Sequence, residues 1–241
     1  MSAEHHFTLY STVRGPNGWK VAMVLEELGL SYQTIYLDFS KDEHHSPEYL
    51  KYNPNGRIPT LIDHKNGDFA IWESDAILVY LAEKYDPEGK FSVKDFEGRM
   101  QQLQWLFFQA SGQGPYYGQA AHFLRYHSEH IPSAIERYQK EVLRVLGVLD
   151  GVLSKREWLV GDKCTIADLS FVSWNVSATM FLLKDYPGFD LAKDFPSTYR
   201  QVQSSRYAGL PLTEPSRWHA SMLAREKVAK VLATQFKMLN I

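Results

Sequence analysis

Two short segments place polar residues where a helix is expected to begin. Glu73 and Ser74 follow a strand-like run and precede an apolar helical pattern. The unpaired N–H groups and the dipole at a helix start favour a carboxylate, to which the Ser74 hydroxyl can also donate. Asn17 follows Pro16, a residue suited to the first position of another helix. Its amide does not titrate near neutral pH, but its N–H can donate to an anion such as a thiolate.

The side-chain inventory disfavours several other kinds of site. The single cysteine, Cys164, excludes an intramolecular disulfide, a CxxC redox site and a cysteine-rich zinc site. The nine histidines form no HExxH pattern, and neither a GxGxxG segment nor a phosphate-binding loop is found. We therefore expect no metal and no nucleotide cofactor.

Composition and charge are typical of a globular protein. Apolar residues make up 44% of the 241 residues, which is enough to form a core. The 26 basic and 28 acidic residues give a net charge of −2, so there is no electrostatic reason to expect nucleic acid as a partner. The longest apolar run, 76–82, is far shorter than the roughly 18 residues of a membrane span. The first residues lack a secretory pattern, and we expect a cytoplasmic protein.

The first half alternates strand-like and helix-like segments. A helix is predicted from Pro16 to about residue 28, and a short helical turn is predicted at 46–47. Ser74 is expected to cap a helix that runs to about residue 85. Strands are predicted at four places, the last two joined by a hairpin turn at Asn66-Gly67: 7–11, 32–37, 60–63 and 69–72.

The second half has few strand signals. Thr165 and Asp168 form a Thr-x-x-Asp start before an apolar run, which predicts a capping box with a structural role. Residues 112–131 mix glycine, aromatic residues and histidine without one period. Turn residues at 86–89 separate this half from the first. Helical periodicity predicts helices over 96–111, 132–154, 165–181, 195–204 and 215–236.

Two motifs resemble the glutathione-binding motifs of the cytosolic glutathione transferases: NPNGRIPTL at 53–61 and WESDAI at 72–77. The segments at 15–18 (GPNG) and 43–48 (EHHSPE) are most similar to the fungal class related to the yeast nitrogen-catabolite regulator and to the bacterial Nu class. The resemblance covers nearly the whole chain. It implies an α+β, thioredoxin-like, glutathione-binding domain at 1–88. An all-α domain at 89–241 follows, with a second-substrate pocket and a C-terminal helical extension.

The resemblance also implies which residues bind glutathione. Ser74 would hold the γ-glutamyl carboxylate and Glu73 the ammonium group. If the peptide bond before Pro59 is cis, the N–H and C=O of Ile58 turn outward and can pair with the cysteinyl backbone. The plainer alternatives are that Ser74 is only a helix cap and that Ile58-Pro59 is an ordinary trans entry to a strand.

Two more residues are expected near the glycyl end of the ligand. By family position, His44 would donate to the glycyl carboxylate, and Arg57 would add positive charge near a carboxylate. The alternatives are that His44 is a solvated loop histidine and that Arg57 simply lies at the surface. His122 and Arg125 are weaker candidates for contact with a second charged ligand.

The resemblance implies that Asn17 faces the glutathione sulfur and stabilises it as a thiolate. A free thiol has a pKa near 8.5, and lowering it by about two units makes most of it thiolate at pH 7. Ser11 is the alternative stabiliser, because many transferases place tyrosine, serine or cysteine just after the first strand. Tyr10 and Ser11 should point to opposite faces of the sheet, so both cannot serve.

The function implied is that of a glutathione transferase. Its thiolate would attack small electrophiles, and disulfide-bond reductase, deglutathionylation or peroxidase activity would follow from an amide-stabilised sulfur. The implied partners are glutathione or oxidised glutathione, small electrophiles or glutathionylated molecules, and a second copy of the chain in a homodimer, with no nucleic acid and no membrane. The alternatives are a non-catalytic regulator that retains the fold and a carrier of apolar ligands.

Overall fold

The computed structural model describes residues 5–199 and 217–241. The chain divides into two compact units, one formed by 1–90 with 226–241 and the other by 91–225. The C-terminal helix therefore belongs with the first unit, whereas the sequence assigned all of 89–241 to one helical domain. The cause is a stripe of buried apolar residues along that helix, Val228, Val231, Leu232 and Phe236.

A mixed four-stranded sheet organises the first unit. Its strands are β1 (Phe7–Ser11), β2 (Tyr32–Tyr36), β3 (Thr60–Asp63) and β4 (Phe69–Trp72), in the order β2-β1-β3-β4. The β2 strand runs parallel to β1, whereas β3 and β4 are antiparallel to their neighbours. This is the thioredoxin-like arrangement that the sequence predicted.

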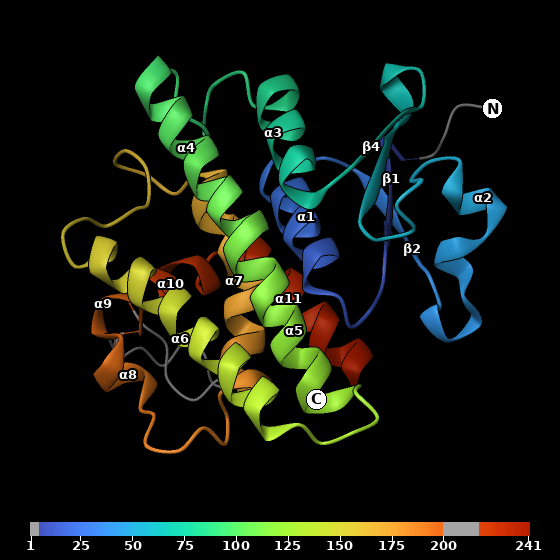
Figure 1. The fold of residues 1–241 in the computed structure, drawn as a ribbon. Coiled ribbons are helices and arrows are strands. Elements are labelled where there is room, and N and C mark those ends of the chain that lie inside the picture. Colours follow the sequence, from blue (N-terminus) through green and yellow to red (C-terminus); the bar gives the residue numbers. More distant parts are fainter. Residues whose placement is uncertain (1–4, 200–216) are drawn as a thin grey trace. The chain divides into compact units, whose positions relative to one another are not determined.

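Helices cover both faces of this sheet. Figure 1 shows α1 (Pro16–Glu27) and α3 (Ser74–Tyr85) on one side and the short α2 (Pro47–Leu50) on the other. Short 3-10 turns occur at Phe39–Lys41, Glu43–His45 and His64–Asn66. The last of these, followed by Gly67 at φ 64°, makes the β3–β4 connection longer than the two-residue turn predicted at Asn66-Gly67. Helix α11 (Glu226–Leu239) contacts α1.

The second unit is helical in its described residues. Residues 112–131, which showed no single period in the sequence, are helical up to Arg125. A π-helical turn joins two α-helices there, and this interrupts the 3.6-residue period. The elements of this unit are α4 (Phe96–Phe108), a π-helix (Gln109–Gln113), α5 (Gly114–Arg125), α6 (Pro132–Leu153), α7 (Ile166–Ser177), a second π-helix (Ala178–Leu182), α8 (Leu191–Asp194), α9 (Pro196–Tyr199) and α10 (Arg217–Leu223).

Two predicted helices of the second half differ from the structure. The helix predicted over 215–236 is broken at residues 224–225, and its parts, α10 and α11, belong to different units. The helix predicted over 195–204 is present as α9 up to Tyr199, and its remainder lies outside the described residues. No helix in the described ranges has both the length and the apolar character that crossing a membrane requires.

The predicted capping box is confirmed at the start of α7. The N–H of Thr165 donates to Asp168 Oδ2 at 2.9 Å, and the N–H of Ala167 donates to Thr165 Oγ1 at 3.2 Å. The other oxygen of Asp168 accepts from the N–H of Leu159 at 2.9 Å and from the indole of Trp218 at 2.8 Å. Asp168 is fully buried, so it is a structural determinant of the helical unit.

Candidate functional site

The start of α3 carries Glu73 and Ser74. Glu73 is the N-cap residue, with φ 68° and ψ 112°, a backbone conformation that residues other than glycine rarely adopt. Ser74 is the first helical residue, so the prediction that it caps the helix is wrong by one position. In the described part of the chain no hydrogen bond engages its hydroxyl. The Ser74 hydroxyl is therefore available to a ligand together with the N–H groups of the first turn, which have no partner within the helix.

A buried ion pair fixes this helix start against α1. Lys20 Nζ lies 2.7 Å from Asp75 Oδ1, and the side chain of Lys20 is 0% exposed. Burial lowers the pKa of Lys20, and the negative charges of Asp75 and Glu73 oppose that shift. Glu73 therefore lies within electrostatic range of this pair, and the pair holds the second turn of α1 to the first turn of α3.

The start of α1 lies beside Ile58. Pro16 is the first helical residue and Asn17, which is half-buried, is the second. A Cβ atom added to Gly15 would lie 2.8 Å from Thr12 Cγ2 and 3.0 Å from Ile58 Cδ1, so a side chain here would require both neighbours to shift. The indole of Trp19 donates to the Val13 carbonyl at 2.8 Å and holds the loop between β1 and α1.

The backbone at Ile58 is open. The Ile58–Pro59 peptide bond is cis, as the resemblance implied. Among residues 5–199 and 217–241, neither the N–H nor the C=O of Ile58 has a hydrogen-bonding partner. The register pairs Thr60 with Trp72, which brings the Ile58–Pro59 segment next to Glu73. The structure thus brings together Ile58, Glu73 and the start of α1.

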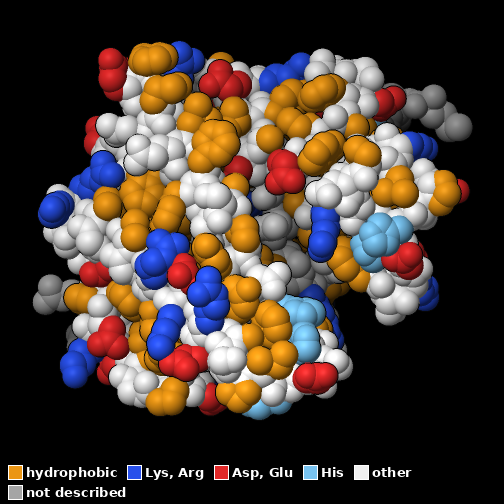
Figure 2. All heavy atoms as spheres, viewed as in Figure 1, with side chains coloured by type: hydrophobic (Ala, Val, Ile, Leu, Met, Phe, Trp, Pro, Cys, Tyr) orange, Lys and Arg blue, Asp and Glu red, His pale blue; other side chains and the backbone are white. Residues whose placement is uncertain are grey.

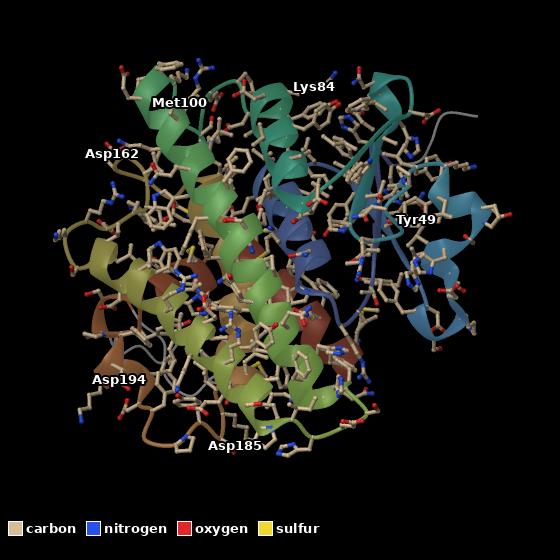
Figure 3. All side chains as sticks on the ribbon, viewed as in Figure 1. Tyr49, Lys84, Met100, Asp162, Asp185 and Asp194 are labelled. Atoms are coloured by element: carbon tan, nitrogen blue, oxygen red, sulfur yellow. The ribbon has the colours of Figure 1, made fainter. Side chains whose placement is uncertain are left out.

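Two side chains that the sequence reasoning did not assign a role hold this segment in place. Figure 3 shows Tyr49 extending from α2 toward the strands. Its hydroxyl donates to the Arg57 carbonyl and lies 2.8 Å from Thr60 Oγ1. Asn53 Nδ2 donates to the Arg57 carbonyl at 2.7 Å and to Thr60 Oγ1 at 3.1 Å. Nothing distinguishes Tyr49 among the 14 tyrosines of the sequence. Asn53 belonged to the quoted motif.

His44 and Arg57 also lie close together. A Cβ atom on Gly56 would lie 3.3 Å from the carbonyl oxygen of His44. The imidazole of His44 stacks on Phe39 with ring centroids 4.0 Å apart, and its buried Nδ1 has no hydrogen bond. Burial lowers the pKa of His44, and the positive charges of His45 and Arg57 add to the effect. His44 is therefore mainly neutral at pH 7, whereas the exposed Arg57 supplies charge.

The competing thiolate stabilisers face elsewhere. Ser11 is 2% exposed, and a Cβ atom on Gly18 would lie 1.9 Å from its Oγ, so helix α1 covers this hydroxyl. Tyr10 points to the other face of the sheet, as predicted, where its ring lies 5.3 Å from that of Tyr49. Burial raises the pKa of Tyr10, which disfavours its phenolate.

One group of metal-ligand atoms occurs in the described part of the chain. Single ligand atoms of Asp42, His44 and His45 lie within 4.8 Å of one another. Nδ1 of His45 is already 2.7 Å from Asp42 Oδ1, and Nε2 of His44 is 3.7 Å from the same oxygen. Only the contact between His45 and Asp42 is a hydrogen bond, and the group does not by itself indicate a metal centre.

Charge on the visible surface is mixed. On the face drawn in Figure 2, basic and acidic side chains are interspersed and neither sign forms a broad field.

Both parts of the chain match known families. The model of the glutathione S-transferase N-terminal domain matches residues 5–83, and that of the glutathione S-transferase C-terminal domain matches residues 117–202. Glutathione S-transferase 1 of Schizosaccharomyces pombe is 49% identical over 227 residues, which cover 91% of this chain and 92% of that protein.

Two further relatives bear on function. The transcriptional regulator URE2 of Saccharomyces cerevisiae is 42% identical over 229 residues, covering 80% of this chain and 63% of that protein. The crystal structure of the glutathione transferase URE2P6 from Phanerochaete chrysosporium, in complex with oxidised glutathione, is 53% identical. It superimposes with a TM-score of 0.86, and the alignment covers 98% of this chain and 99% of that chain.

Proposed function

Because the chain belongs to the glutathione transferase family, we propose that it binds glutathione along Ile58, between the starts of α1 and α3, and activates the thiol as a thiolate. The observation that carries this proposal is the unpaired backbone of Ile58, which lies next to Glu73 before α3 and whose side chain lies beside Gly15 before α1. An extended tripeptide can form a short ladder with such a backbone edge.

Groups that complement the charged ends of the tripeptide lie on both sides of the Ile58 backbone. Ser74 and the first N–H groups of α3 bind the γ-glutamyl carboxylate, because a helix start carries partial positive charge. Glu73 pairs with the adjacent ammonium group. At the other end, Arg57 supplies positive charge for the glycyl carboxylate, and the mainly neutral His44 contributes a hydrogen bond.

Asn17 is proposed to stabilise the sulfur. Its amide N–H donates to the thiolate, and the start of α1 adds favourable electrostatics. The burial of Ser11 beneath Gly18 and the position of Tyr10 on the opposite face support Asn17 over both alternatives. The proton is lost to water, because an amide cannot accept it near neutral pH.

Three reactions are open to such a thiolate. Attack on an electrophilic carbon forms a thioether and expels the leaving group. Attack on the glutathione sulfur of a mixed disulfide forms oxidised glutathione and releases the other thiolate. Reduction of a hydroperoxide consumes two glutathione molecules and yields oxidised glutathione, alcohol and water. In the disulfide and hydroperoxide reactions glutathione undergoes the redox change, so no cysteine of the protein is required.

Resemblance to a transcriptional regulator supports a second candidate, a protein that binds glutathione without turnover. A carrier of apolar ligands would behave in the same way. Parallel assays with an aryl halide, a mixed disulfide and a hydroperoxide distinguish these functions from catalysis. Turnover of any of the three supports the transferase. Tight glutathione binding without turnover supports the regulator or the carrier.

We also propose that the chain forms a homodimer. Each unit exposes large apolar side chains of the kind that a subunit interface covers. In the first unit these are Phe69 and Trp72 on β4, 43% and 38% exposed, and in the second Phe96 and Phe107 on α4, 63% and 70% exposed. Light scattering at several protein concentrations tests the dimer, and a constant monomer mass would contradict it.

A cytoplasmic location stays a prediction.

Calorimetry tests the binding proposal directly. We expect reduced or oxidised glutathione to bind the protein. Substitution Arg57→Ala should weaken binding, because it removes positive charge near the glycyl carboxylate. The matched variant Lys51→Ala, which removes a lysine from the same segment, should leave the affinity within about twofold. If neither oxidation state of glutathione binds, the site assignment is wrong and only the family relationship remains.

A further inference from the structure

A cavity lies within the first unit, between the sheet and two helices. It has a volume of about 260 Å³ and lies between β1, β2, α1 and α11, the last two of which contact each other (Figure 1). Its walls include Leu9, Trp19, Tyr32, Tyr36 and Val231. The volume is slightly below the roughly 300–1,000 Å³ usual for ligand pockets, so one or two rings would fill it.

Aromatic side chains form much of this wall. Along β2, Tyr32, Thr34 and Tyr36 line the cavity, whereas the alternate residues are exposed. The rings of Trp19 and Tyr36 lie 5.8 Å apart at an angle of 35°. Their π faces provide a surface that is attractive to apolar rings and to cations.

One carboxylate is fixed at this wall. The side chain of Glu26 is only 18% exposed. The hydroxyl of Tyr32 donates to Glu26 Oε1 at 3.5 Å, and burial together with this carboxylate raises the pKa of Tyr32, which keeps the phenol neutral. The cavity therefore combines aromatic faces with the carboxylate of Glu26, which is largely buried and held by Tyr32.

The counterion of Glu26 in the structure is Lys230, whose side chain is largely exposed to solvent. Lys230 Nζ lies 3.1 Å from both carboxylate oxygens, but its side chain is 64% exposed. Exposed ion pairs contribute little to stability, so this ammonium group can be exchanged at small cost. A ligand that carries its own positive charge could replace Lys230 beside Glu26 and place its ring against the tyrosines.

From these contacts we infer that the cavity binds a small organic cation, an aromatic molecule of one or two rings with an ammonium group. Glu26 pairs with the charge, and Trp19, Tyr32 and Tyr36 surround the ring. One end of the cavity reaches Ser11 and Gly18, close to Asn17, whereas Glu26 lies nine residues, or roughly 14 Å of helix, beyond Asn17 along α1, so the charge-binding end is distant from the proposed sulfur position. The inference does not depend on the proposed catalytic role.

Titration calorimetry with benzyltrimethylammonium tests the inference, with benzyl alcohol as the neutral probe and 3-phenylpropionate as the anionic one. We expect the cation to bind more tightly than either. Glu26→Gln should weaken cation binding by about tenfold, the effect of losing one charge-assisted contact. Glu27→Gln is the matched control: it removes a neighbouring carboxylate that does not line the cavity, and it should change the affinity less than about twofold.

Lys230→Met gives the most specific result. It removes the competing ammonium group, so cation binding should become several-fold tighter, whereas a site for anions would be weakened. Glutathione affinity, measured on the same samples, should not change in any of these variants. The inference is overturned if the cation does not bind, if Glu26→Gln binds it as well as the native chain, if Lys230→Met weakens its binding, or if 3-phenylpropionate binds more tightly.

Discussion

The buried pair between Lys20 and Asp75 allows a quantitative test of how the site is held together. In Asp75→Asn, the ammonium group of Lys20 loses its ion pair with the Asp75 carboxylate while its side chain stays 0% exposed. Breaking a buried ion pair by removing one partner costs about 3–5 kcal/mol of the free energy of unfolding. Lys20 can instead release its proton, which costs about 1.4 kcal/mol for each pH unit below the ordinary lysine pKa, or about 5 kcal/mol at pH 7. Whether Lys20 stays charged or releases its proton, the free energy of unfolding of the variant is expected to fall by about 3–5 kcal/mol.

The pH dependence fixes the sign of the effect. Burial already lowers the pKa of Lys20, and removing Asp75 removes the larger of the two negative charges that oppose this shift. The unfolded chain then binds a proton that the folded chain lacks, so the free energy of unfolding of the variant rises with pH. The deficit relative to the native chain should shrink by about 1.4 kcal/mol per pH unit between pH 7 and pH 9.

Urea unfolding followed by circular dichroism, at one fixed protein concentration, measures this deficit. Glu83→Gln, at an exposed position of the same helix, is the matched control and should change the free energy of unfolding by less than about 0.5 kcal/mol. The double variant Lys20→Met with Asp75→Leu should recover to within about 1 kcal/mol of the native value, because well-packed apolar residues can replace a buried ion pair. A loss below about 1 kcal/mol in Asp75→Asn, or a deficit that grows with pH, would refute this reasoning.

Three further predictions concern the roles assigned above. Asn17→Ala should raise the pKa of bound glutathione by about one unit or more, measured from thiolate absorbance, and an unchanged titration would exclude the amide as stabiliser. Ser74→Ala should weaken glutathione binding by roughly ten- to a hundredfold in calorimetry while changing the free energy of unfolding by less than about 0.5 kcal/mol, and equal losses would make it a structural residue. Asp168→Ala should cost at least about 3 kcal/mol of the free energy of unfolding, because it leaves the N–H groups of Leu159 and Thr165 and the Trp218 indole unpaired. Its affinity for glutathione per folded molecule should not change, and a selective loss of affinity would contradict the structural role.

Local patterns predicted most of the first unit. The strands and α1 follow from alternation, helical spacing and the proline at the helix start, which act over a few residues. The start of α3 was missed by one residue, because the positive φ of Glu73 is a backbone feature that its side chain does not reveal. The break at 224–225 was also missed, since neither residue there disfavours a helix and the two helices belong to different units.

Buried polar contacts were the least predictable part of the site. Lys20 is a charged residue within an apolar run of α1, and that mismatch is the signal that could have revealed its partner. Tyr49 carries no comparable signal, because its role depends on a carbonyl eight residues away in the chain. Contacts of this kind depend on how the loop before β3 folds back on α2, which sequence spacing does not specify.

Much of the proposed glutathione site is backbone, and this explains both the success and the limits of the sequence reasoning. The N–H and C=O groups at Ile58 and at two helix starts are common to almost every residue type, so only the turn and capping residues around them indicate their position. The side chains that hold this backbone, Tyr49, Asn53 and the Lys20–Asp75 pair, need not touch the ligand. Binding should therefore be as sensitive to these positioning residues as to the residues that contact glutathione, because a ladder to the ligand forms only while the Ile58 edge keeps its orientation.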